Sequence, residues 1–137
     1  MASNVEWSTP PGTMAPIGPY SHIAKAGPFI TIGDTAGVDP VPGQFLDAFE
    51  TMLASVDASL DDVMHIHVFL ADMDDFGAMN AVYAEKMGGR RPARTAIAVT
   101  GLPKAGAVVT MNLTAVAGGA ISWINKRRTG KNDRAHS

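Results

Sequence analysis

The chain contains no cysteine among its 137 residues, and this absence excludes several kinds of site. It rules out a disulfide framework, a thiolate nucleophile and a zinc site built on cysteine. Charged residues are sparse at 18%, and no apolar run reaches the roughly 18 residues that a membrane-spanning helix needs. The first residues, MASNVEWSTPPGTMAP, lack the basic start and apolar centre of a signal peptide. We therefore expect a cytoplasmic protein that does not enter a membrane.

The composition is sufficient for one folded domain. With 46% apolar residues, the 137-residue chain fits the roughly 100–200 residues of a single domain. We expect an irregular lead-in over residues 1–14, one domain over 15–121 and a basic, flexible tail over 122–137. The tail holds five of the 11 Lys and Arg residues, whereas the rest of the chain carries six basic and 12 acidic side chains. An acidic body argues against nucleic-acid binding by the domain. For the tail, a solvated end and a basic arm for an anionic partner both stay open.

The hydrophobic periodicity predicts the element order β-β-α-β-α-β-β. The strands are expected within 20–38 (two strands, with a turn at 26–28) and at 63–71, 95–100 and 107–117, and the helices at 45–60 and 76–87. Strands that alternate with two helices favour an α+β fold, in which one mixed sheet carries both helices on a single face. The stretch VVTMNLTAV at 108–116 has apolar residues on both of its faces. We therefore expect self-association to bury the face without helices.

Several familiar motifs are absent or incomplete. HIH at 65–67 places two imidazoles on one strand face, but no third ligand is apparent, so a half-exposed pair is favoured over a metal site. The glycine-containing loops GDTAG and GGRRPAR match neither the dinucleotide nor the P-loop pattern. The sequence therefore predicts no metal and no cofactor.

Arg94 is the most informative single residue. It stands at the head of an apolar alternating run in RRPARTAIAV, residues 90–99. A charged head that enters a strand either stays at the rim beside an acidic neighbour or is held there to bind an anion. A guanidinium suits a substrate carboxylate because its fork contacts both oxygens.

Longer stretches carry a resemblance to a known family. RPARTAIAVTGLPKAGAVVTMNLTAVA, APIGPYSH, FITIGDTAGVDP and VFLADMDDFGAMNAVYAEKM match, in order, motifs of the reactive intermediate deaminase (Rid) family, also called YjgF-like or L-PSP endoribonuclease. The matches cover residues 15–117. The resemblance implies a chorismate-mutase-like fold and a homotrimer whose clefts lie between subunits.

The resemblance also implies a set of site residues. Arg94 would bind the substrate carboxylate, and Tyr20 and Asn80 would line the same cleft. Backbone groups near Gly33 and Ala96 would help to hold the ligand. Family enzymes with deaminase activity hydrolyse 2-imino or 2-enamino acids to 2-keto acids and ammonia without a cofactor.

The chain departs from the family at the catalytic positions. Thr110 stands where the family has a glutamate that acts as general acid and base, and Asn112 replaces a second acidic residue. Ile32, Asp34 and Ala96 replace a serine, a glutamine and a common cysteine. A threonine hydroxyl positions water but does not exchange protons near neutrality, and general acid–base catalysis contributes about 10²–10⁴-fold.

Three alternatives follow from these departures. Arg94 alone orients a reactive imine, or Asp34 supplies the missing carboxylate, or the chain binds a carboxylate metabolite or a different substrate. The expected function is imine hydrolysis with Arg94, Asp34 and Thr110 as catalytic residues. A non-catalytic trimer that binds carboxylates is the alternative, and an endoribonuclease is the weakest candidate.

Overall fold

The computed structural model describes residues 4–37 and 43–118, with the backbone alone at 36–37 and 43–45. The predicted tail at 122–137 lies outside these residues. The helices and strands are β1 (Glu6–Ser8), β2 (Ile23–Ala26), β3 (Phe29–Gly37), α1 (Gly43–Ala54), β4 (Val63–Leu70), α2 (Phe76–Met87), β5 (Ala93–Ala98) and β6 (Val109–Val116).

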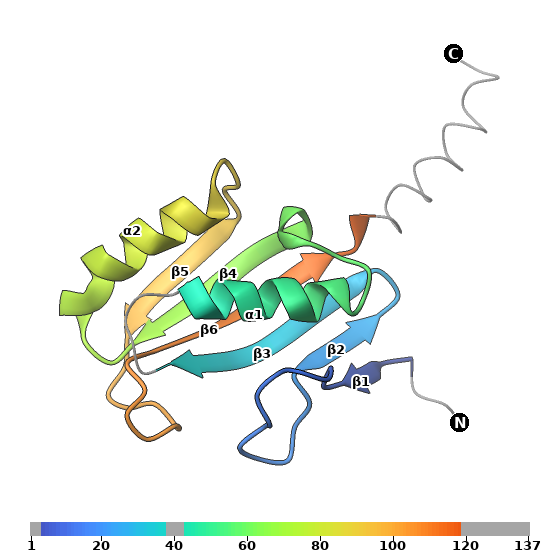
Figure 1. Cartoon of the computed structure of the whole chain (residues 1–137), viewed down its shortest axis with the longest axis horizontal. Helices are drawn as coiled ribbons and strands as arrows, with labels where there is room; N and C mark the ends of the chain where they lie inside the picture. The colour runs from blue at the N-terminus through green and yellow to red at the C-terminus, as the bar shows by residue number, and fades with distance from the viewer. Residues whose placement is uncertain (1–3, 38–42, 119–137) are drawn as a thin grey trace, which may run out of the picture.

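One six-stranded sheet organises the chain, with the strand order β1-β2-β3-β6-β4-β5. β4 and β5 pair in parallel, while the other neighbours pair antiparallel. The connection between the parallel strands runs through α2, as such a crossover requires. Both helices lie on the same face of the sheet, α1 in front of β3 and β6 and α2 beside β5 (Figure 1). The α+β fold class is therefore confirmed.

The core lies between the sheet and the two helices because alternate strand residues point toward the helices. In β4 these residues are Ile66, Val68 and Leu70, each fully buried. They pair with the buried Leu113, Met111 and Val109 of β6. The helices contribute the buried residues Leu46, Phe49, Met52 and Leu53 from α1 and Met79, Tyr83 and Met87 from α2.

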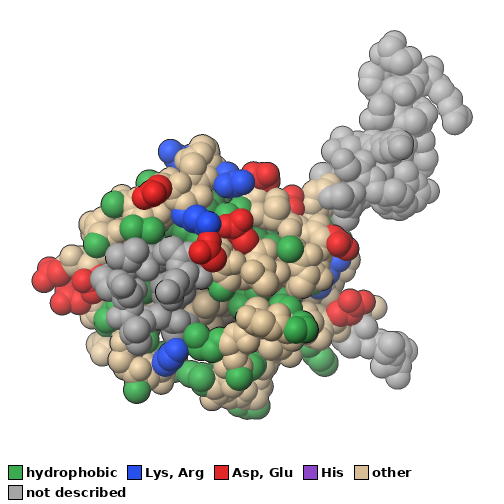
Figure 2. Space-filling view, viewed as in Figure 1, with side chains coloured by type: hydrophobic (Ala, Val, Ile, Leu, Met, Phe, Trp, Pro, Cys, Tyr) green, Lys and Arg blue, Asp and Glu red, His purple; other side chains and the backbone are tan. Residues whose placement is uncertain are grey.

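Outside the core, an ion-pair cluster joins the two helices. Lys86 of α2 lies against Asp47 of α1 and 3.0 Å from Glu50. Acidic and basic side chains accordingly lie together over the helices in the space-filling view (Figure 2). The cluster joins one positive charge to two negative ones on the outer side of the helices.

Two sequence predictions need correction. The lead-in at 1–14 is not wholly irregular, because Glu6–Ser8 pairs with β2 and adds an edge strand to the sheet. The first helix ends at Ala54 and does not continue to residue 60. Its end is set by Asp57, which adopts a positive φ of 61°, and by a bond from the Ala58 N–H to the Leu53 carbonyl at 2.9 Å. This is the Schellman arrangement that terminates a helix.

The sheet face away from the helices is more polar than predicted. On β6 it presents Thr110, Asn112 and Thr114, with Val116 as the apolar member. Its exposed apolar side chains come from other strands, with Phe29 of β3 at 64% exposure and Ile97 of β5 at 45%. No described helix covers this face (Figure 1). Self-association through it stays a prediction.

Candidate functional site

Arg94 lies on the helix-covered face of β5, beneath α2. It faces this way because it pairs with the buried Ile66 in the parallel register of β4 and β5. Its Nη1 donates to Asn80 Oδ1 at 2.7 Å, and its guanidinium carbon lies 4.8 Å from the centre of the Tyr83 ring and 5.6 Å from that of Phe76. Among the described residues no carboxylate pairs with it. Arg94 is thus held by a neutral amide and two aromatic faces, as a cation kept for an anion would be.

A pocket of about 280 Å³ surrounds this guanidinium. We call it the arginine pocket, and its lining residues are Asn80, Tyr83, Ala84, Arg90, Arg91, Pro92 and Arg94. Tyr83, only 8% exposed, belongs to the core and also lines this pocket. Burial raises the pKa of its hydroxyl above the usual value, and the positive charges of Arg94 and Arg91 partly offset that rise.

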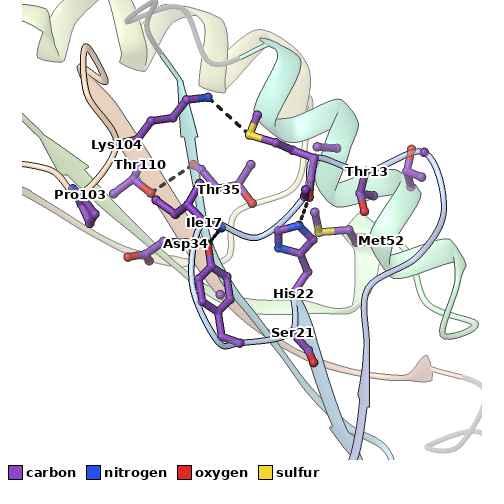
Figure 3. Close-up of a pocket in the computed structure, with 17 residues that line it drawn as sticks. Thr13, Ile17, Ser21, His22, Asp34, Thr35, Met52, Pro103, Lys104 and Thr110 are labelled. Atoms are coloured by element: carbon purple, nitrogen blue, oxygen red, sulfur yellow. Dashed lines mark hydrogen bonds between the residues drawn. The ribbon is translucent and has the colours of Figure 1, made fainter.

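The other predicted site residues lie around a different and larger hollow. Tyr20, Gly33, Asp34 and Thr110 all line a cavity of about 670 Å³ between the lead-in, β3, β6 and α1 (Figure 3). We call it the aspartate cavity. The sequence prediction therefore names residues that do gather, but in two groups rather than one.

Asp34 lies at an irregularity of β3. The pairing of β3 with β6 shifts register between Ile32 and Thr35, which leaves Gly33 and Asp34 out of the ladder. The exposed Asp34 accepts a hydrogen bond from Asn112 Nδ2 at 2.7 Å through Oδ1. The Gly33 N–H donates to the His22 carbonyl at 3.0 Å, so this N–H is already engaged. The bulge thus places an exposed aspartate in the lining of the cavity, with its carboxylate bonded to a neutral amide.

Thr110 is almost fully buried, at 2% exposure. Its hydroxyl donates to the Thr35 carbonyl at 3.2 Å (Figure 3). A hydroxyl that has given its only proton to a carbonyl retains lone pairs that accept from water. Thr110 is therefore suited to orient a water molecule and not to supply a proton.

The lead-in forms the outer wall of the aspartate cavity. The Tyr20 hydroxyl accepts from the Ile17 N–H at 3.3 Å, and the buried His22 ring bonds to the Met14 carbonyl (Figure 3). Lys104 of the β5–β6 loop contacts the Met14 sulfur at 3.4 Å. Lys104 is not among the site residues predicted from the sequence, although it directly follows the Leu-Pro pair of the motif that contains Arg94.

Two strands of the sheet separate the strand that carries Asp34 from the strand that carries Arg94. β3, which carries Asp34, and β5, which carries Arg94, have β6 and β4 between them. Three strand spacings amount to about 14 Å. Ala96, two residues beyond Arg94, is half-buried, packs against the core and lines neither hollow. A single copy of the chain therefore does not bring Arg94 to Asp34.

His65 and His67 lie on the open face as a stacked pair, with ring centres 4.2 Å apart. His65 Nε2 is bonded to Thr95 Oγ1 at 3.0 Å. No cluster of three or more potential metal ligands occurs within the described residues. The pair has the half-exposed strand placement that the alternation of β4 predicts.

Comparison with known proteins now identifies the family. The sequence model of the family described as endoribonuclease L-PSP matches residues 12–117. The chain belongs to this family, the YjgF or Rid family. A RutC family protein of Pyrococcus horikoshii is 42% identical over 101 residues, which span 65% of this chain and 80% of that protein. A mouse 2-iminobutanoate/2-iminopropanoate deaminase is 35% identical over 116 residues, spanning 76% and 85% respectively.

Solved structures agree with membership of the YjgF family. The yeast protein YEO7 superposes with a TM-score of 0.75 at 26% identity, covering 82% of this chain and 98% of that one. A member of the YjgF/YER057c/UK114 family from Mycobacterium tuberculosis gives a TM-score of 0.67 at 26% identity, with coverage of 71% and 86%. No helix in the described part of the chain is long and apolar enough to cross a bilayer.

Proposed function

We propose that the chain is an imine deaminase that works as a homotrimer, in a cleft formed by the arginine pocket of one copy and the aspartate cavity of the next. The separation of the two hollows is the observation that carries this proposal. Arg94 has no carboxylate partner among the described residues, and Asp34 lines an apolar cavity, so the chemistry of the two side chains is complementary. Within one copy, however, strands β6 and β4 lie between the strand of Asp34 and that of Arg94. Closed symmetry with a head-to-tail contact brings such patches together in every interface.

In this cleft the Arg94 fork binds the carboxylate of a 2-imino acid and fixes the imine carbon. Asp34 takes a proton from a water molecule as the water oxygen bonds to the carbon of the protonated imine, and the imine nitrogen becomes an amine. The proton on Asp34 then passes to the amine, and the C–N bond breaks while the hydroxyl group gives its proton back to Asp34 and becomes the carbonyl of the 2-keto acid. The departing ammonia takes up that proton and leaves as ammonium. The reaction adds one water and requires neither an oxidant nor a reductant.

The remaining predicted residues have supporting roles in this proposal. Thr110 orients the water through its oxygen, while Tyr20 and Asn80 shape the walls. The Gly33 N–H is bonded to His22, so that Gly33 would contribute its carbonyl instead. Ala96 lies on the same strand face as Arg94, but it packs against the core and lines neither hollow, so the proposal gives it no contact with the substrate.

The test measures ammonia release from imines that an amino-acid oxidase generates in place. We expect Arg94→Ala and Asp34→Asn each to lower the rate, the latter by about 10²–10⁴-fold if Asp34 is the general base. Asp57→Asn is the matched control, since Asp57 is an exposed carboxylate that lines neither hollow. Near-native turnover by Arg94→Ala would sink the deaminase proposal.

Mixing the two inactive variants tests the shared cleft directly. After subunit exchange, about a quarter of the clefts in a random trimer pair an intact Arg94 with an intact Asp34. Activity should therefore return to about that fraction of the native rate. A mixture as inactive as its components would mean that the two residues do not meet across subunits.

A carboxylate-binding protein without turnover is the second candidate. The observation that favours it is the buried Thr110, which brings no acidic group to β6. Keto-acid binding with no acceleration of any imine would support it. The endoribonuclease activity named in the family description is a third candidate, and cleavage of single-stranded RNA that Arg94→Ala abolishes would favour it.

A further inference from the structure

Arg91 lines the arginine pocket together with Arg94, and no carboxylate among the described residues neutralises its charge. Its Nη1 donates to two backbone carbonyls, those of Gly88 at 2.5 Å and Arg90 at 2.8 Å. Within the described residues it pairs with no carboxylate. A guanidinium has five N–H donors, so most of its donors stay available. The two carbonyl contacts anchor this side chain at the pocket without using its charge.

Arg90 provides the contrast within the same pocket. Its Nε bonds to Asp61 Oδ1 at 2.6 Å, and its Nη1 lies 3.4 Å from the Met87 carbonyl. Of the three guanidinium groups that line the pocket, one is therefore paired with a carboxylate, and two are not. The pocket therefore carries two positive charges that no carboxylate in the described part of the chain balances.

The Tyr83 hydroxyl is a second, independent sign of a ligand. Tyr83 is 8% exposed, and its hydroxyl is buried with no hydrogen-bond partner among the described residues. A buried polar group without a partner is destabilising. The ring lies under Arg94, and the charges of Arg94 and Arg91 both lower the pKa of this hydroxyl against the larger effect of burial. Both cations thus act on one unpaired donor.

Two nearby cations repel each other unless a ligand supplies negative charge, and a single carboxylate neutralises only one of them. A ligand with two carboxylates balances both. The forked donors of arginine match carboxylate oxygens, and the Tyr83 hydroxyl is placed to donate a further bond.

We propose that this cleft prefers a dicarboxylic 2-imino acid, with Arg94 binding the carboxylate next to the imine and Arg91 with Tyr83 binding the distal carboxylate. This inference rests on the proposed function for its reaction and adds the class of substrate. Hydrolysis proceeds as for a monocarboxylic imine, with the distal carboxylate unchanged in the 2-keto product.

Ligand binding tests this without relying on turnover. Calorimetric titration compares 2-oxoglutarate, which has two carboxylates, with 2-oxobutanoate, which has one. We expect the native chain to bind 2-oxoglutarate about tenfold more tightly, and Arg91→Gln to lose that advantage while its affinity for 2-oxobutanoate stays within about twofold. Added salt should reduce the native preference, since Arg91 is exposed.

Two further variants sharpen the comparison. Tyr83→Phe removes only the hydroxyl and should weaken 2-oxoglutarate selectively. Lys25→Gln removes one positive charge on β2, away from the arginine pocket, and should change neither affinity. Rates on the two corresponding imines should follow the same order as the affinities.

Equal native affinity for the two keto acids would overturn the inference, as would an equal loss of both in Arg91→Gln. If Arg91→Gln instead dissociates the oligomer in sedimentation, Arg91 pairs with an acidic residue of a neighbouring copy, and the inference is likewise wrong. A selective loss of 2-oxoglutarate binding with no turnover of any imine would separate the two claims. The proposed function would then fail, and the preference for two carboxylates would stand.

Discussion

Replacing Asn80 with aspartate changes the charge beside Arg94 while keeping the shape of the side chain. Asn80 Oδ1 lies 2.7 Å from Arg94 Nη1, so the same atom would become a carboxylate oxygen within ion-pair distance. An internal carboxylate would then compete with the anion that we propose Arg94 binds. Anion affinity should fall even though a contact inside the protein has become stronger.

The expected size of the effect follows from the surroundings of Arg94. Unit charges about 4 Å apart attract by about 4 kcal/mol at an effective dielectric constant of about 20, whereas exposed pairs contribute about 0.2–1 kcal/mol. Arg94 is half-buried against Tyr83 and Phe76, which places it between these limits. We expect a loss of about 1–3 kcal/mol in anion binding, or roughly 5- to 150-fold.

Calorimetric titration with 2-oxobutanoate and thermal unfolding together check this reasoning. The affinities should rank native, then Asn80→Ala, then Asn80→Asp, while the Tm of Asn80→Asp equals or exceeds that of the native chain. Ala78→Asp is the control, since it adds the same charge to an exposed position about 200° round α2. If Asn80→Asp bound as tightly as the native chain, or no more weakly than Ala78→Asp, Arg94 would not be the anion anchor.

Two further predictions concern stability. Met111→Ala removes a fully buried side chain from β6 and should lower the free energy of unfolding, measured in urea, by about 2–5 kcal/mol. The control Glu85→Ala changes an exposed side chain and should alter that free energy by no more than about 0.5 kcal/mol. Equal losses in the two variants would contradict the assigned core. Hydrogen bonds to Asp47 and Glu50 raise the pKa of Lys86 in the folded protein. The contribution of Lys86 to folding stability is therefore fully present below the unfolded pKa of about 10.4, and it is lost as pH rises through the folded pKa. The Tm difference between the native chain and Lys86→Gln should therefore be measurable at about pH 8 in low salt and should vanish at higher pH, and a difference that persists there would refute this linkage.

The elements with strong local signals were predicted well. α2 begins at Phe76 and ends at Met87 as expected, and Gly88 follows it with a positive φ. Asp75 makes no side-chain capping bond to the helix, whereas Asp72 accepts from the Asp74 N–H and caps the 3-10 turn that leads into it. α1 was predicted too long because Asp57 carries the positive φ that more often belongs to glycine. β1 was missed because three exposed residues carry no alternation of burial.

The candidate site was predictable in its members and not in its arrangement. Arg94 was identified by its charge at the head of a strand, but its partner Asn80 comes from the preceding helix. Asp34 and Asn112 meet across 78 residues because a register shift turns Asp34 out of the ladder, and no local pattern encodes that contact. Tyr83 has the spacing of a core residue, and only the structure shows that this buried side chain also lines the pocket of Arg91 and Arg94.

The position of β6 has a consequence for how the chain is made. β6 follows the other five strands in sequence yet lies between β3 and β4 in the sheet. β6 is the strand that pairs with both β3 and β4, so the ladder that joins β1–β3 to β4–β5 cannot form until residues 109–116 have left the ribosome. Until then, the edges of β3 and β4 that will bind β6 can pair with other nascent chains. Such long-range closure slows folding. A chain that ended before Val109 would therefore form two unjoined parts of the sheet whose open edges are prone to aggregation, and not a smaller folded domain.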